Sequence, residues 1–364
     1  MQDGLILSIE ECDETTDLWL SAGFIDLQVN GYMGLDLNTD DLAPETVIKL
    51  TQTMLAAGVT SFAPTVITAA ETTLLHRLRS IAKAYKSDSH VMACVPFIHV
   101  EGPHISPLDG YRGAHAREFV RPPSLAEFER WQEASDGLVG LVTLSPHFER
   151  SDEYIAALVS RGVHVAIGHT HASLEQIQSA VNAGASLSTH LGNGIAPQIA
   201  RHPNPIWSQL ADDRLAASFI ADGHHLPAET LKAMARAKGL ERSILVSDTV
   251  ALAGTPAGTY TAPVGGSVEL SPEGRLSMAG TTTLAGAAIP LVRCIGKAVR
   301  MTGRSLGEVL TMATMNPGRF ARGRGQLRTG ARADLIRFRW TGEVVLQDVW
   351  LAGERVYPAD PATP

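Results

Sequence analysis

Four side chains in this sequence have the chemistry to hold a metal ion and move a proton. They are Glu101 in VPFIHVEG, His169 in HVAIGHTH, His190 in SLSTHLGNG and Asp248 in SILVSDT. One carboxylate and two imidazoles make up the ligand set of a catalytic zinc or iron site with an open position for water. A carboxylate beside such a site can take a proton from the water and pass it to a leaving group. The residue types therefore predict metal-assisted hydrolysis with Asp248 as general base.

The histidines are distributed unevenly along the chain. Of 13 histidines, 12 lie between His90 and His225, and none follows His225. A lone histidine is more often an ordinary core or surface side chain than a ligand. Here, however, many of them stand at the ends of apolar runs, together with Glu101 and Asp248. This placement favours a shared site over chance.

Short, β-rich apolar runs recur along the first two thirds of the chain. They begin at Gly23, Thr60, Val95, Leu138, His164, Ser186, Leu215 and Ser243. Each is followed by a turn signal and a helix-like stretch, and the intervals suit strand–helix units. Eight such units in series predict an α/β protein with a (β/α)8 TIM-type barrel rather than a doubly wound sheet. Active sites of such barrels lie at the carboxyl ends of the strands, where the four side chains fall.

The remaining segments predict the elements around the barrel. Pro44–Gly58 and Ser173–Gly184 carry helix start and stop signals, and the second has a Ser cap with Gln three residues later. Residues 288–303 and 305–322 are typical of two further helices, while 259–280 alternates like a β-hairpin insertion. The tail is strand-like, as is LILSIEE at 5–11. We therefore expect a small β-sandwich-like domain from residues 1–21 and 326–364, and a barrel over 22–325.

Composition excludes several classes of protein. The chain has 364 residues, with 30 basic and 38 acidic side chains, a net charge of −8. This balance argues against nucleic acid or an anionic membrane as the main partner. No run of 18 apolar residues is present, and the three cysteines form no C-x-x-C pair. We expect a cytoplasmic protein without a membrane segment, a disulfide framework or a thiolate zinc site.

As an ordered set, the motifs resemble the amidohydrolase superfamily and, within it, the N-acetylglucosamine-6-phosphate deacetylases. The resemblance covers nearly the whole chain. The residues that carry it are GFIDLQVNGYMG (23–34), HVEGPHISP (99–107), GAHAREFVRPP (113–123), GHTHAS (168–173), THLGNG (189–194), IADGHHL (220–226), LVSDTVALAG (245–254) and NPGRFARGRGQLRTGARADLIRF (316–338). It implies a hydrolase that removes acetate from an N-acetyl amino sugar phosphate, above all N-acetylglucosamine 6-phosphate.

The resemblance also implies roles for particular residues. Many amidohydrolases carry His-x-His on the first strand, where this chain has Gln28 and Asn30, as these deacetylases do. The pattern implies one divalent metal per subunit, zinc or iron, held by Glu101, His169 and His190. Gln28 would orient a ligand by a hydrogen bond, or the pair is the remnant of a second metal site.

Substrate contacts follow from the same resemblance. His115 and His225 match histidines that contact the substrate, and Asn193 and Gly194 match a loop that supplies amide contacts to the sugar phosphate. Arg201 matches an arginine that reaches the phosphate of a neighbouring subunit, which implies a homodimer. The alternative for Arg201 is an ordinary surface arginine.

Two departures from the family pattern leave other substrates open. The loop is THLGNG where the family commonly has THLYNAM, and His171 replaces a usual Asn. The alternatives are another N-acetyl hexosamine or an N-acyl-D-amino acid. A further alternative is an inactive barrel that acts as a binding protein. The intact set of Glu101, His169, His190 and Asp248 argues against that last possibility.

Overall fold

The computed structural model describes residues 1, 3–10, 16–262 and 266–358, and its centre is an eight-stranded parallel sheet. Neighbouring strands follow the order β2-β5-β6-β7-β8-β9-β10-β11, which is also their order along the chain. An isolated bridge between Val29 and Thr249 joins the two ends of this sheet. The predicted (β/α)8 barrel is therefore confirmed. The strands are β2 (Phe24–Val29), β5 (Val59–Ile67), β6 (Ile98–Glu101), β7 (Val139–Leu144), β8 (His164–Ile167), β9 (Leu187–Ser188), β10 (Ala216–Ile220) and β11 (Ser243–Val246).

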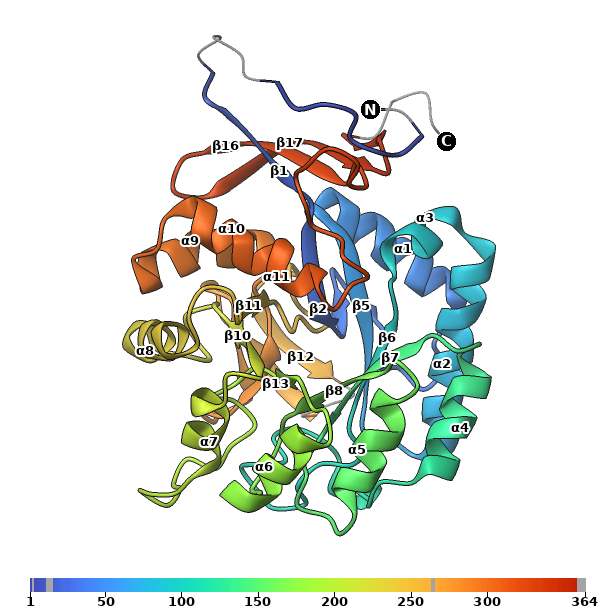
Figure 1. The fold of residues 1–364 in the computed structure, drawn as a ribbon, viewed down its shortest axis with the longest axis vertical. Coiled ribbons are helices and arrows are strands. Elements are labelled where there is room, and N and C mark those ends of the chain that lie inside the picture. Colours follow the sequence, from blue (N-terminus) through green and yellow to red (C-terminus); the bar gives the residue numbers. More distant parts are fainter. Residues whose placement is uncertain (2, 11–15, 263–265, 359–364) are drawn as a thin grey trace.

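Seven of the eight strands lie inside one of the predicted apolar runs, and β5 begins at Val59, one residue before its run. Their side chains are buried almost throughout. Parallel strands covered on both faces carry continuous apolar runs, which explains why these runs stand out in the sequence. Helices surround the barrel (Figure 1). They are α1 (Pro44–Ala56), α2 (Glu71–Ser87), α3 (Ser89–Cys94), the short 3-10 helix Arg117–Phe119, α4 (Leu125–Ala134), α5 (Ser151–Val159), α6 (Leu174–Asn182), α7 (Pro205–Ala211), α8 (Ala228–Lys238), α9 (Leu291–Thr302), α10 (Leu306–Ala313) and α11 (Met315–Gly318).

Local sequence signals explain where several helices begin and end. Pro44 opens α1, and Ser173 and Gln176 form a reciprocal capping box at the start of α6. The prediction of one helix over 305–322 is wrong, because the backbone of Thr314 breaks it at φ −132° and ψ −81°. Pro317 lacks an amide hydrogen and would clash with the preceding turn of a continuous helix. The chain therefore stops at Ala313 and restarts as α11.

Both ends of the chain build a second sheet apart from the barrel. Its antiparallel order is β1-β16-β17-β18, with β1 (Leu18–Ala22), β16 (Leu335–Trp340), β17 (Val344–Leu351) and β18 (Glu354–Tyr357). In Figure 1 this sheet lies at one end of the molecule, next to α9 and α10. Leu346 of β17 packs against Gly58 at the amino end of β5. The sheet thus lies at the end of the barrel opposite the strand ends that carry the site.

The N-terminal strand was predicted in the wrong place. Residues 6–10 form no regular strand, and Leu5 makes one isolated bridge with Arg332. The strand that pairs with β16 is Leu18–Ala22, which has no strict alternation to reveal it. The domain limits at 21/22 and 325/326 stay predictions, and residues 11–15 and 359–364 lie outside the described part.

The predicted hairpin insertion near 259–280 falls in a four-stranded antiparallel sheet. The strands are β12 (Gly258–Ala262), β13 (Gly266–Leu270), β14 (Arg275–Met278) and β15 (Leu284–Ala287), and residues 263–265 lie outside the description. A two-stranded ribbon, β3 (Gly31–Tyr32) with β4 (Leu35–Asp36), follows β2. Both units border the cavity described below. No helix in the described residues is long and apolar enough to cross a membrane.

Candidate active site

Three of the predicted site residues have an unusual backbone conformation at the carboxyl end of a strand. His169 follows β8 at φ +47°, His190 follows β9 at +29°, and Asp248 follows β11 at +53°. Residues other than glycine rarely adopt positive φ, and such strain collects at functional sites. The turns aim these side chains inward; His169 and His190 are buried, and Asp248 is half-buried.

The carboxylate of Glu101, the last residue of β6, is the meeting point of the site. Its Oε1 lies 2.9 Å from Nε2 of His190 and 3.3 Å from Nε2 of His169. The side-chain amide of Gln28 donates to the same oxygen at 3.0 Å. The three predicted metal ligands are therefore brought together, and Gln28 donates a hydrogen bond to one of them.

Ionisation of this cluster favours a charged carboxylate. Burial alone would raise the pKa of Glu101, but hydrogen bonds and charge from His169 and His190 outweigh it and hold the pKa well below the usual value. Burial likewise opposes the charged form of His190, yet Glu101 raises the pKa of that imidazole above its usual value. The site thus holds an anionic oxygen next to imidazole nitrogens, a donor set suited to a divalent metal.

His169 is fixed from two sides. Its Nδ1 donates to the backbone carbonyl of Tyr111 at 2.9 Å, which leaves Nε2 facing Glu101. Two glycines border the ring: a Cβ atom at Gly194 would lie 2.7 Å from Nδ1, and one at Gly113 would lie 3.1 Å from Cε1. Gly194 was predicted as a substrate contact, and in the structure it also makes room for His169.

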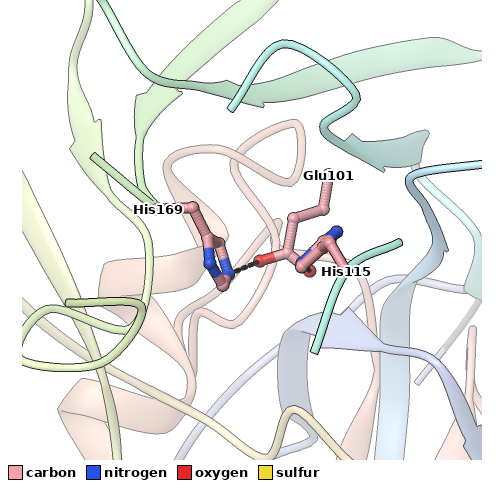
Figure 2. A group of neighbouring side chains, drawn as sticks. All are labelled: Glu101, His115 and His169. Atoms are coloured by element: carbon pink, nitrogen blue, oxygen red, sulfur yellow. Dashed lines mark ion pairs between the residues drawn. The ribbon is translucent and has the colours of Figure 1, made fainter. Parts of the chain in front are cut away.

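His115 belongs to the same cluster. One ligand atom each from Glu101, His115 and His169 lies within 4.8 Å of the others, and Figure 2 shows the three side chains facing one another. Nε2 of His115 is 3.9 Å from Oε2 of Glu101, and its Nδ1 is 2.8 Å from the hydroxyl of Thr68. Burial, with the charge of His169, lowers the pKa of His115 to about 3, so the imidazole is neutral.

Asp248 follows β11 and lies beside the carboxyl end of β2. Its Oδ1 accepts a hydrogen bond from the side chain of Asn30 at 2.8 Å. Burial raises the pKa of Asp248 to about 6, and the negative charge of Glu101 adds to the shift. A carboxylate with such a pKa can both accept and release a proton near neutral pH. Gln28 and Asn30 thus serve two different side chains of the site.

His225 is held by an aspartate that sequence reasoning missed. Asp222 accepts from the backbone N–H groups of His224 and His225 at 2.8 and 2.9 Å, and its Oδ2 lies 2.7 Å from Nδ1 of His225. Burial would raise the pKa of Asp222, but its hydrogen bonds with His225 lower it to about 2. An Asp three residues before a functional His in ADGHH was the available signal. Thr68 and Tyr111 gave no comparable signal, because only the fold brings them to the site.

One cavity of about 590 Å³ connects these groups. Glu101, His115, His169, His190, His225 and Asp248 line it, together with Asn30, Asn193 and Gly194. The inserted sheet adds apolar side chains such as Leu276 and Leu284. Among the described residues, no lysine or arginine lines the cavity. Arg201 is exposed on the loop before α7 and is not among the lining residues, so the structure does not bring it to the site of its own subunit.

The other histidines of the cluster occupy different surroundings. His99 lies inside the barrel, with Nε2 2.8 Å from the hydroxyl of Thr143. His104 packs between Trp131 and Tyr154. His147 and His171 lie next to each other, with ring centroids 4.3 Å apart. The excess of histidines thus combines site residues with structural ones.

Comparison with known proteins agrees with this geometry. The model of the amidohydrolase family matches residues 19–356. The chain belongs to the amidohydrolase family. Both the fold and the suspected relationship are therefore confirmed.

Similar proteins of known activity cover almost the whole chain. An N-acetylglucosamine-6-phosphate deacetylase of Mus musculus is 34% identical over 361 residues, 95% of this chain and 85% of the relative. An N-acetylgalactosamine-6-phosphate deacetylase of Escherichia coli O157:H7 is 30% identical, over 97% of this chain and 92% of the relative. A variant of N-acetyl-D-glucosamine-6-phosphate deacetylase from Mycobacterium smegmatis, solved with N-acetyl-D-glucosamine-6-phosphate, superimposes with a TM-score of 0.86 at 27% identity. It matches over 98% of this chain and 93% of that one.

The residues present fit a metal ion. Two buried imidazoles direct Nε2 at one buried carboxylate oxygen, and the opposite nitrogen of His169 is held by a backbone carbonyl, as is usual for metal-binding histidines. A Glu/His/His cluster is thus present at the carboxyl ends of the barrel strands.

Proposed function

We propose that this protein is a metal-dependent deacetylase that releases acetate from an N-acetyl amino sugar phosphate, with N-acetylglucosamine 6-phosphate as substrate. The products are acetate and glucosamine 6-phosphate. The observation that carries the proposal is the convergence of Glu101, His169 and His190 in the cavity that also holds Asp248. The activities of the relatives support the substrate class.

Glu101, His169 and His190 would hold one divalent metal per subunit, zinc or iron, since both metals accept these ligands. When bound, the metal supplies Lewis-acid polarisation of the amide carbonyl and lowers the pKa of a coordinated water. Gln28 orients Glu101 by its hydrogen bond. The supporting observation is that both imidazoles approach the same carboxylate oxygen, whereas His115 is closest to the other one.

Asp248 acts as the general base and then as the general acid. It takes a proton from the attacking water and delivers it to the amine nitrogen as the C–N bond breaks. Asn30 fixes the carboxylate for this transfer by donating to Oδ1. Burial supports both roles, because it brings the pKa of Asp248 to about 6.

The remaining lining residues bind the sugar. His115 and His225 present neutral or hydrogen-bonded imidazoles to the acetamido group and the ring hydroxyls, and Asn193 and Gly194 supply amide groups. A phosphate needs a cation, and the lining of one subunit supplies none among the described residues. We therefore place Arg201 of a second copy at the phosphate in a homodimer, where its planar fork can form two charge-assisted bonds.

A second candidate substrate is N-acetylgalactosamine 6-phosphate. It is favoured by the activity of the Escherichia coli relative. Acetate release from the two phosphorylated sugars, measured side by side with their unphosphorylated forms, separates the candidates. The proposal requires a preference for a 6-phosphate; equal rates without phosphate would contradict it.

The base assignment has its own test. Asp248→Asn should retain the metal and the fold but lower kcat by at least about 100-fold, as expected for the loss of a general base. Metal content and acetate release are measured on the same preparation. Retained turnover at full metal occupancy would refute the role of Asp248.

The cellular setting proposed for this reaction is the cytoplasm. Cys94 and Cys294 are free, buried thiols, which suits a reducing compartment.

A further inference from the structure

The barrel closes at a seam between β2 and β11 that contains few backbone hydrogen bonds. Asp248 donates its N–H to the carbonyl of Gln28 at 3.0 Å, and Asn30 donates to the carbonyl of Thr249 at 2.9 Å. These bonds lie at the carboxyl end of the seam, where the site is. Gln28, Asn30 and Asp248 therefore depend on the same few contacts for their relative position.

A fully buried carboxylate replaces the next hydrogen bond of this seam. Asp26 of β2 is 0% exposed, and its Oδ1 accepts from the N–H of Ser247 at 3.1 Å and from the N–H of Gln28 at 3.3 Å. One oxygen of Asp26 thus binds both Ser247, which precedes Asp248, and Gln28, which donates to Glu101. The other oxygen, Oδ2, has no hydrogen-bond partner in the described part of the chain.

We propose that Asp26 is a positioning residue for the reaction. By holding Ser247 and Gln28 on one oxygen, it sets the spacing of β2 and β11 so that Asp248 and the Gln28–Glu101 pair face the same cavity. This inference rests on the proposed function. It adds a residue that does not line the cavity, although its side chain is fully buried.

The role of Asp26 depends on its oxygen rather than on its charge. No ion pair to Asp26 exists among the described residues, and burial raises its pKa to about 7. Its hydrogen bonds come from uncharged groups of Gln28 and Ser247, which a carboxamide oxygen can also accept. An isosteric amide should therefore preserve the seam, whereas an apolar side chain of similar size should leave two buried N–H groups without an acceptor.

Three variants separate positioning from mere stability. Asp26→Asn retains the acceptor, and Asp26→Val removes it. Asp334→Val removes another buried carboxylate, directly before β16, that accepts a backbone N–H at 2.8 Å and pairs with Arg332. For each variant, kcat and KM are measured per metal-loaded subunit, beside thermal unfolding. A displacement of about 1 Å at a reacting group can lower a rate about 100-fold. We expect this loss in kcat for Asp26→Val with KM nearly unchanged.

The controls decide the outcome. Asp334→Val should lower the unfolding temperature and leave kcat near wild type, and Asp26→Asn should retain kcat within about threefold, a change of under 1 kcal/mol in activation free energy. Wild-type kcat in Asp26→Val would overturn the inference. So would a 100-fold loss in Asp26→Asn at full metal occupancy, which keeps the test decisive if Asp26→Val does not fold.

A structural readout distinguishes failure of this inference from failure of the proposed function. In a crystal structure of Asp26→Val, the bond from Asn30 to Oδ1 of Asp248, 2.8 Å in the native chain, should lengthen by about 1 Å, the misplacement invoked above. An unchanged bond would overturn the positioning role even in a protein without deacetylase activity. A wild-type chain that releases no acetate would refute the proposed function, whereas a lengthened bond would still support the role of Asp26.

Discussion

At the scale of single residues, the site depends on how its imidazoles are held. Gly194 leaves room for the ring of His169, since a Cβ atom there would lie 2.7 Å from Nδ1. We expect Gly194→Ala to displace this ligand and weaken metal binding by about 10- to 100-fold, the range seen when the support of a ligand is lost. Metal titration of the metal-free protein measures the effect.

The matched control is Gly330→Ala. Gly330 also has positive φ, at +79°, but nothing lies within 4 Å of its Cβ position. It should therefore cost stability without changing metal affinity. Equal metal affinity in both variants would show that His169 does not depend on Gly194.

His115 and His190 make a second pair of residues with separable roles. We expect His190→Asn to lose the metal, because Nε2 of His190 shares an oxygen of Glu101 with His169. His115→Asn should retain the metal and lower kcat/KM, because we assign His115 to the substrate. Metal content measured after dialysis tests the pair; loss of metal in His115→Asn alone would exchange the two assignments.

His104 makes folding stability depend on pH. It is buried between Trp131 and Tyr154, and burial lowers its pKa to about 4 from 6.5. Below pH 6.5 the unfolded chain binds a proton that the folded chain refuses, so stability falls as the pH drops from 6.5 towards 4. This shift corresponds to about 3 kcal/mol.

Urea unfolding of wild type and His104→Asn at pH 7 and pH 5 isolates this contribution. The variant should be less stable at pH 7 but should lose less stability on acidification than wild type. The same loss in both proteins would assign the pH dependence to other buried histidines, such as His99.

At the scale of elements, α6 begins directly after the turn that carries His169. Ser173 caps it and accepts from the N–H of Gln176. Ser173→Ala should lower the free energy of unfolding by about 1 kcal/mol. Ser160→Ala, at the end of α5, is the control with an expected effect within about 0.5 kcal/mol. Equal effects in thermal unfolding would contradict a specific capping role.

Elements with strong local signals were predictable, and those decided by distant contacts were not. The eight barrel strands are buried on both faces, so each appears as an apolar run that periodicity detects. The first three residues of the strand Leu18–Ala22 are apolar but half-buried or exposed, so the sequence shows no alternation that would reveal a strand. The strand forms by pairing with residues 335–339, far along the chain. The break at Thr314 depends on Pro317 and on Asn316, which donates to the carbonyls of Leu240 and Ser243.

The same division holds within the site. Strand-end residues that the structure brings to one cavity, such as Glu101, His169 and Asp248, could be singled out from residue type and position. The residues that hold them could not. Tyr111 acts through its backbone carbonyl, and Asp26 acts across a seam that exists only in the closed barrel.

At the scale of the whole molecule, the proposed homodimer makes a distinctive prediction. If Arg201 serves the neighbouring site, a subunit with Arg201→Ala and a subunit with Asp248→Asn should complement each other in a mixed dimer. The site with an intact Asp248 then receives Arg201 from the other subunit. Acetate release from the phosphorylated sugar should reappear when the two inactive variants are mixed and allowed to exchange subunits. Absence of recovery in a verified mixed dimer would refute the shared site.

The central claim is that one metal ion, held by Glu101, His169 and His190, is required for hydrolysis. The most direct measurement is a titration of metal-free protein with Zn²⁺ while acetate release from N-acetylglucosamine 6-phosphate is followed. We predict that activity rises from zero and levels off at one equivalent per subunit. Activity in the metal-free protein, or no acetate release at any equivalence, would contradict the claim.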